Sequence, residues 1–154
     1  MNLFDIVGPV MVGPSSSHTA GAVRIGQVSR HLLGESVKEA KILLHGSFLA
    51  TGKGHGTDKA LVAGLLGMAA DDIRIPDSFD IAKESGVKFE IGKIQLKNAH
   101  PNSVKLLLVG ESGRNLEIVA CSLGGGRIKI CTIDGLEANF SGEYTTCLLY
   151  TSDA

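Results

Sequence analysis

The sequence predicts an α+β fold, in which N-terminal helices pack on a largely antiparallel mixed sheet. Helical apolar spacing dominates the first half of the chain, and short alternating strands separated by hairpin-type turns fill the second half. This order of elements favours α+β over a doubly wound sheet. At 154 residues the chain is long enough for one domain with a hydrophobic core.

The first helix is expected over residues 18–33, where apolar side chains recur at three- and four-residue steps. Gly34 is the expected C-terminal stop, because glycine readily adopts the left-handed conformation that follows many helices. Arg30 and His31 suit the negative end of the helix dipole in the last turn. We expect no further role for His31.

The middle of the chain predicts a strand, a glycine-rich loop and two further helices. Residues 37–44 form the strand, residues 51–58 the loop, and residues 59–68 an apolar helix with Thr57 or Asp58 as N-cap. Ser78 is then expected to cap a short helix that Gly86 ends.

The second half predicts a meander of short strands. Alternation of apolar and polar residues indicates a half-buried strand over 87–91. Further strands are expected over residues 104–109, 116–122 and 128–133, and a last strand follows Asp134-Gly135 and runs through Phe140. Gly124–Gly126 lies between two strands rather than ahead of a helix, which favours a tight turn or a bulge over a pyrophosphate-binding loop.

Composition excludes several classes of function. The net charge is -1 and no stripe of Lys and Arg appears, which argues against a nucleic-acid partner. No apolar run approaches the roughly 20 residues that span a bilayer. The N-terminal residues lack the basic start and apolar block of a secretory signal, so a cytoplasmic location is expected.

The cysteines point away from a metal site. Cys121, Cys131 and Cys147 form no Cys-x-x-Cys pair and have no histidine at zinc spacing. An odd number in an intracellular chain is typical of reduced, mostly buried thiols. We therefore expect no metal ion or iron–sulfur cluster bound wholly by this chain.

A cluster of hydroxyls precedes the first helix. A Gly-Pro turn leads into Ser15, Ser16 and Ser17, followed at once by His18 and Thr19. Free N–H groups and the positive end of the helix dipole converge there with the hydroxyls, which is typical of an anion site. Ordinary N-capping is the alternative, but it needs one serine. The surplus favours a ligand carboxylate or phosphate.

Histidines in turns supply candidate proton-transfer groups. His55 lies between Gly54 and Gly56, so its backbone can approach a ligand closely, and Asp58 could fix its tautomer. The alternative is a surface-loop histidine. His100 begins a His-Pro-Asn turn, and His45 directly follows the first predicted strand.

These motifs, taken together, resemble a known family. Gly-Pro-Ser-Ser-Ser-His-Thr, His-Gly-Ser-x4-Gly-Lys-Gly-His-Gly-Thr-Asp, His-Pro-Asn and Ser-x-Gly-Gly-Gly are similar, in this order, to the β subunit of iron–sulfur-dependent L-serine dehydratases. The resemblance covers residues 1–146. It implies a two-chain enzyme whose α subunit ligates the 4Fe–4S cluster, with a β domain over 1–143 and the start of a missing ACT domain at 144–146.

The resemblance implies conversion of L-serine to pyruvate and ammonia, with an open iron of the cluster as Lewis acid for the departing hydroxyl. It makes His55 and His100 the candidate catalytic residues, with Asp58 and His45 supporting them. The implied substrate contacts are Ser15, Ser16, Ser17, His18, Thr19, Ser47 and Asn102. Serine and threonine both stay open as substrates, and a higher oligomer is possible.

A second resemblance supplies a different function. The β domain is also similar to the allosteric substrate-binding domain of some 3-phosphoglycerate dehydrogenases. A regulatory module that binds an amino acid or anion without catalysis is therefore the alternative. The serine cluster would serve either function, because capture of an anion requires no proton transfer.

The last eight residues break register with everything before them. Residues 147–154 resemble the in-frame translation of a transposase sequencing adapter. We therefore expect the natural chain to continue differently after Thr146, and Cys147 to be no part of it.

Overall fold

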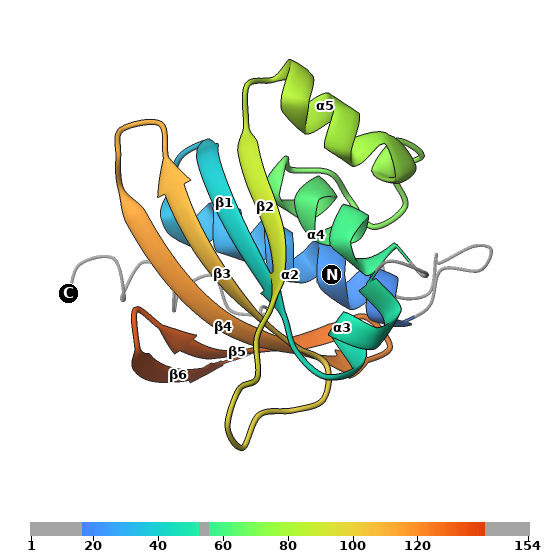
Figure 1. The fold of residues 1–154 in the computed structure, drawn as a ribbon, viewed down its shortest axis with the longest axis vertical. Coiled ribbons are helices and arrows are strands. Elements are labelled where there is room, and N and C mark those ends of the chain that lie inside the picture. Colours follow the sequence, from blue (N-terminus) through green and yellow to red (C-terminus); the bar gives the residue numbers. More distant parts are fainter. Residues whose placement is uncertain (1–16, 53–55, 141–154) are drawn as a thin grey trace, which may run out of the picture.

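The computed structural model describes residues 17–52 and 56–140 of the chain, and their fold is drawn in Figure 1. Within them, six strands form one sheet in the order β2-β1-β3-β4-β5-β6. The elements in chain order are α2 (Ser17–Leu33), β1 (Val37–Leu44), α3 (Ser47–Gly52), α4 (Thr57–Leu65), the 3-10 helix η2 (Ile75–Asp77), α5 (Ser78–Glu84), β2 (Lys88–Lys93), β3 (Ser103–Gly110), β4 (Asn115–Gly124), β5 (Arg127–Ile133) and β6 (Leu136–Phe140).

The sheet is mixed but largely antiparallel, which confirms the predicted fold class. β1 pairs in parallel with β2, while β1 with β3, β3 with β4, β4 with β5 and β5 with β6 are antiparallel. β1 and β2 can be parallel because helices connect them. The strands from β3 to β6 are each joined to the next by a short turn, which makes neighbours antiparallel. As a result, the end of β1, the start of β3 and the end of β4 meet at one edge of the sheet.

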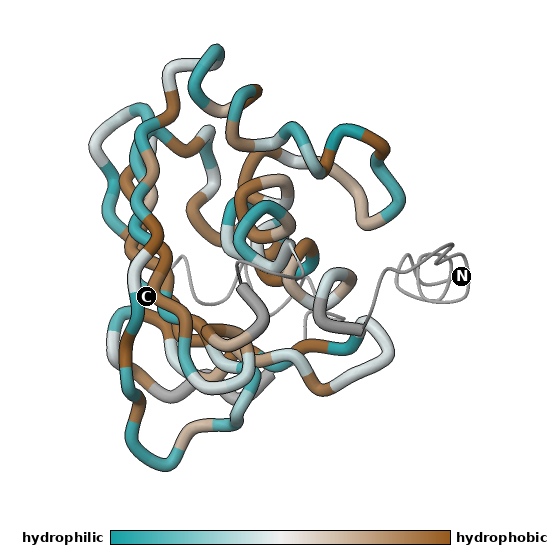
Figure 2. Tube along the Cα trace, turned by 45° about the vertical axis from the view of Figure 1, so that its right-hand side comes forward, coloured by the Kyte–Doolittle hydropathy of each residue, from teal (hydrophilic) through white to brown (hydrophobic). Residues whose placement is uncertain are grey.

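The helices form a layer on one face of the sheet. Figure 1 shows α2 crossing that face, and Figure 2 shows the strands to the left of the helical layer. Between the layers lies a row of fully buried side chains, Ile42, Leu106 and Ile118, which face one another on three adjacent strands. Val23 and Ile25 of α2 are also fully buried and belong to this core.

α2 and α4 cross at two glycines. A Cβ atom on Gly64 would overlap the carbonyl oxygen of Val23 and lie 2.9 Å from the Cα of Gly26. A Cβ atom on Gly26 would lie 2.6 Å from the carbonyl oxygen of Leu61. The helices therefore pack backbone against backbone, which neither helix could do with a larger residue at these positions.

Most predicted elements are present, and two capping predictions are wrong. The N-cap of α4 is Gly56, with φ 76°, and neither Thr57 nor Asp58 holds that position. Ser78 is the first residue of α5 rather than its cap, and its hydroxyl instead donates to the carbonyl oxygen of Lys59 at 2.8 Å. Gly34 and Gly86 end their helices as predicted, both with positive φ.

The short helix α3 was not predicted. The sequence indicates only that residues 45–47 leave β1, whereas the structure forms a helical turn there, closed by Ala50 N donating to Gly46 O at 3.1 Å. Phe48 explains this turn, because its side chain is fully buried in the core. A six-residue helix of this kind depends on tertiary packing rather than on intrinsic propensity.

Two expectations concern residues outside the described ranges. The predicted domain boundary at residues 143–144 and the adapter-like tail over residues 147–154 both lie there, and they stay predictions.

Of the helices in the described ranges, none combines the length and the apolar character that crossing a bilayer requires.

Candidate functional site

The first turns of α2 lie against the end of β4. A Cβ atom on Gly21 would overlap Ser122 Oγ and lie 2.8 Å from Ser122 Cβ, so helix and strand touch at this point. The β4–β5 turn lies beside the same helix face, since a Cβ atom on Gly126 would be 3.6 Å from Ala20 Cβ. The helix that follows the serine cluster therefore begins at the sheet edge where β4 ends.

Two loops from other parts of the chain meet at this edge. His45 N donates to the carbonyl oxygen of Ser103 at 3.1 Å, and Ser47 N donates to the carbonyl oxygen of Pro101 at 2.7 Å. The His45 imidazole also accepts a hydrogen bond at Nδ1 from Leu96 N, at 3.0 Å. The segment that leaves β1 is thus bonded along the loop that leads into β3.

The His-Pro-Asn turn connects this loop pair to β4. Asn102 N donates to His100 Nδ1 at 3.0 Å, and Ser103 Oγ donates to the carbonyl oxygen of His100 at 2.6 Å. The carbonyl oxygen of Asn102 then accepts from Ser122 N at 2.9 Å. Since Ser122 also touches Gly21, these contacts join α2, β4 and both loops into one structure.

The structure therefore brings four of the predicted site residues, His45, Ser47, His100 and Asn102, together at one edge of the sheet, and Thr19 lies in the first turn of α2, two residues before Gly21. We call this edge the candidate site. It consists of the described residues Thr19, His45, Ser47, His100 and Asn102, together with Arg24 and Ser122. Ser17 and His18 are the first residues of α2, so their backbone belongs to the same helix start.

Other predicted residues are not placed at the site. Ser15, Ser16 and His55 lie outside the described residues, so their predicted roles stay predictions. Asp58 is in the first turn of α4, where its Oδ1 accepts a hydrogen bond from Lys59 N at 2.8 Å. That bond involves a helix terminus and does not test the predicted pairing with His55.

Arg24 was missed by the sequence analysis. Its side chain is 3% exposed, and its guanidinium carbon would lie 3.7 Å from a Cβ atom on Gly126. A buried arginine is uncommon, and it brings a permanent positive charge beside the β4–β5 turn, two turns into α2. The sequence does carry one sign of this role, because Arg24 is a cation flanked by the apolar residues Val23 and Ile25.

Ser122 was also missed, although it opens the Ser-x-Gly-Gly-Gly motif. The side chain is 1% exposed, and the three glycines that follow it within four residues all have positive φ, between 63° and 95°. These conformations confirm the predicted tight turn and explain its composition, because side chains with a Cβ atom rarely adopt them.

The described residues do not fit an iron–sulfur cluster. Cys121 and Cys131 are free thiols on neighbouring strands, whereas a 4Fe–4S cluster is typically held by about four cysteines. Over residues 17–52 and 56–140, no group of three or more His, Cys, Asp or Glu side chains is placed to hold a metal ion.

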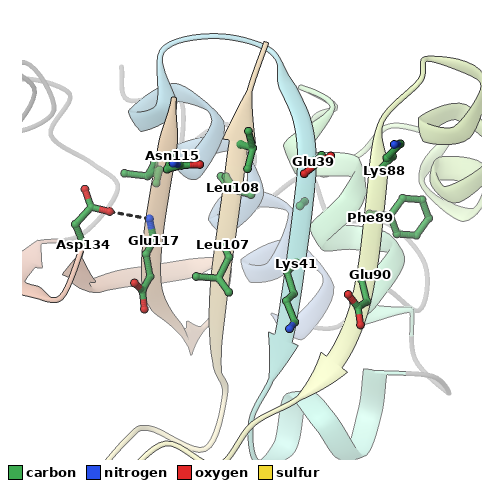
Figure 3. Close-up of a pocket in the computed structure, with 13 residues that line it drawn as sticks. Glu39, Lys41, Lys88, Phe89, Glu90, Leu107, Leu108, Asn115, Glu117 and Asp134 are labelled. Atoms are coloured by element: carbon green, nitrogen blue, oxygen red, sulfur yellow. Dashed lines mark hydrogen bonds between the residues drawn. The ribbon is translucent and has the colours of Figure 1, made fainter. Parts of the chain in front are cut away.

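A hollow of about 640 Å³ lies elsewhere, on the sheet face that the helices leave open (Figure 3). Across it runs a row of facing residues, Glu90, Lys41, Leu107 and Glu117, one from each of four strands. Asp134 at its rim accepts a hydrogen bond from Glu117 N at 2.8 Å. The residues that line the hollow include none of the predicted site residues, and their mixed positive and negative charges are typical of a solvated face.

Known proteins provide an independent comparison. The family model described as serine dehydratase beta chain matches residues 2–131. The chain is 46% identical over 147 residues to the L-serine dehydratase beta chain of Peptoniphilus asaccharolyticus, a match that covers 95% of this chain and 66% of that protein. It is 43% identical over 152 residues to a probable L-serine dehydratase beta chain of Bacillus subtilis, covering 99% and 69%.

A longer relative matches less closely. L-serine dehydratase 1 of Escherichia coli is 30% identical over 155 aligned residues, which cover 83% of this chain and 33% of that protein. The chain thus spans about two thirds of the length of the two beta chains and about one third of the E. coli protein.

Proposed function

This chain belongs to the family of serine dehydratase beta chains, and we propose that it acts with an alpha subunit to convert L-serine to pyruvate and ammonia. The observation that carries the proposal is the candidate site itself. Three segments that are distant in sequence are hydrogen-bonded to one another there, one of them touches α2 at Gly21, and each would contribute polar groups that a small amino acid could contact. The assembled enzyme would be an intracellular lyase and could form a higher oligomer.

The start of α2 would hold the substrate carboxylate. Backbone N–H groups at a helix N-terminus carry partial positive charge and bind anions. Hydroxyls of the serine cluster and of Thr19 would add hydrogen bonds, and the Arg24 guanidinium supplies a full positive charge within the same two turns. A carboxylate is therefore better suited to this position than a neutral group.

His100 would contribute a donor rather than a base. Because its Nδ1 accepts the hydrogen bond from Asn102 N, the proton of the neutral imidazole lies on Nε2. The His100 side chain is exposed, so the Nε2 proton is available to a ligand. This leaves His55 as the better candidate for removing the α-proton of serine, with His100 orienting the substrate or protonating the leaving hydroxyl.

The reaction also requires groups beyond this chain. Loss of the α-proton and the β-hydroxyl gives an aminoacrylate, which tautomerises and hydrolyses to pyruvate and ammonia. We place the 4Fe–4S cluster on the alpha subunit, because the described cysteines do not fit one. Asn102 and Ser47 would contact the substrate amino and hydroxyl groups from the loop into β3 and from the segment that leaves β1.

Reconstitution tests the proposed function. The chain is produced with its alpha subunit without oxygen, and pyruvate release is measured for the mixture and for each chain alone. We expect L-serine-dependent pyruvate from the mixture only, and weaker turnover of L-threonine. If the alpha subunit turns over serine fully by itself and this chain only modulates the rate, the chain is a regulatory module and the proposal is wrong.

A further inference from the structure

Two cysteines outside the candidate site's chemistry lie together on neighbouring strands. Cys121 of β4 faces Lys129 of β5, and Cys131 follows two residues later on β5. A register shift between Val119 and Ala120 bends the ladder at this point, which brings the Cys131 sulfur within 4.0 Å of the Cys121 sulfur. Both thiols are free.

The two thiols have different environments. Cys121 is 2% exposed, whereas Cys131 is half-buried. The pKa of Cys131 is lowered to about 7, because a hydrogen bond with Cys121 and the nearby Lys129 ammonium stabilise its thiolate. The pKa of Cys121 is raised by the same hydrogen bond and by burial. Cys131 is thus the more accessible and the more reactive thiol.

We propose that Cys121 and Cys131 are a redox-active pair that a small disulfide, such as glutathione disulfide, converts into an intramolecular disulfide bond. The Cys131 thiolate attacks one sulfur of the oxidant, which forms a mixed disulfide and releases one glutathione thiolate. The Cys121 sulfur then attacks the Cys131 sulfur, the second glutathione leaves, and the Cys121 proton passes to it or to solvent. Two protein thiols are oxidised and one glutathione disulfide is reduced to two glutathione molecules.

The geometry favours closure within the chain. A disulfide bond is about 2.05 Å long, so the two sulfurs must approach by about 2 Å, which is on the scale of a rotamer change. Lys129, directly opposite Cys121, also attracts the carboxylates of glutathione. No step requires a group from another chain.

Oxidation would act on the candidate site through Ser122. This residue follows Cys121 directly, donates its N–H to Asn102 and packs against Gly21. A new covalent bond at Cys121 would therefore shift the end of β4 relative to α2 and the His-Pro-Asn turn. This part of the inference rests on the proposed function, whereas formation of the disulfide does not.

Peptide mapping tests the pair directly. The full chain carrying Cys147→Ser is incubated with glutathione disulfide, its remaining thiols are alkylated, and it is digested with trypsin. Arg127 and Lys129 provide cleavage points between the two cysteines. We expect residues 115–127 joined to residues 130–154 in a species whose mass is two hydrogen atoms below the sum of the two reduced peptides. When Cys121→Ser is added to Cys147→Ser, the reaction should stop at a glutathione adduct on Cys131, because the second thiol is missing.

Two results would contradict the proposal that Cys121 and Cys131 form a redox-active pair. They are full alkylation of both thiols after oxidation, and a lasting glutathione adduct on Cys131 while Cys121 stays alkylatable.

Hydrogen exchange tests the coupling between the disulfide and the candidate site. We expect the Ser122 amide to exchange at least several-fold faster in the oxidised chain. Linked peptides with unchanged exchange at Ser122 would show that the coupling to the site is wrong. Neither readout depends on serine turnover.

Discussion

Replacement of Gly64 by alanine is expected to destabilise the folded chain by about 3 kcal/mol, even though alanine normally stabilises a helix by roughly 0.5–1 kcal/mol relative to glycine. The added Cβ atom would overlap the Val23 carbonyl oxygen and lie 2.9 Å from Gly26 Cα. Both are backbone atoms that cannot rotate away, so α2 and α4 would have to separate. Urea unfolding measures the loss of unfolding free energy, and equal m-values for wild type and variant show that only stability has changed.

Gly92→Ala is the matched control for this prediction. A Cβ atom there would meet only the Leu43 Cδ2 methyl, at 3.0 Å, and that flexible side chain can move aside. We expect a change within about 1 kcal/mol for this variant. Equal stability of Gly64→Ala and Gly92→Ala would show that the helices do not cross as closely as described.

Replacement of Gly21 by alanine is expected to lower kcat/KM for L-serine by about tenfold or more in the reconstituted enzyme, because misplacement of reacting groups by about 1 Å can cost 10²-fold. The new Cβ atom would overlap Ser122 Oγ and lie 2.8 Å from Ser122 Cβ. The first turns of α2 would therefore move away from β4 and from the His-Pro-Asn turn. Steady-state pyruvate release measures the effect.

A second substitution identifies the cause. Ser122→Gly removes both clashing atoms and leaves Ser122 Cα at 3.7 Å, an ordinary contact distance. The double variant should therefore lose less activity than the two single variants combined, with a coupling of about 1 kcal/mol or more. Simple additivity of the two single effects would contradict direct packing of Gly21 on Ser122.

Local patterns in the sequence predicted much of the fold. The three- and four-residue apolar spacing predicted α2, alternation predicted the strands, and the glycines at positions 34 and 86 end their helices with positive φ. These features depend on neighbours within a few residues, which a single sequence shows directly. α3 was missed because its stability depends on burial of Phe48 against distant elements.

Only part of the candidate site could be predicted, because local motifs identify residues but not the distant contacts that bring them together. Composition and motifs identified Thr19, Ser47 and Asn102, but their convergence arises from strand pairing, in which β1, β3 and β4 share one edge. The roles of Arg24 and Ser122 depend on contacts across 100 residues of sequence, such as that between Gly21 and Ser122. No spacing rule within the sequence shows such a contact.

The site's place in the molecule can be tested with two exposed histidines that differ in position. His100 lies in the candidate site, whereas His31 is in the last turn of α2, about 18 Å along the helix axis from Thr19. We expect His100→Ala to lower kcat of the reconstituted enzyme by about 10²-fold, because a positioned proton donor contributes on that scale. His31→Ala should retain wild-type kcat. Equal kcat values for His100→Ala, His31→Ala and wild type would contradict placement of the serine site at this edge of the sheet.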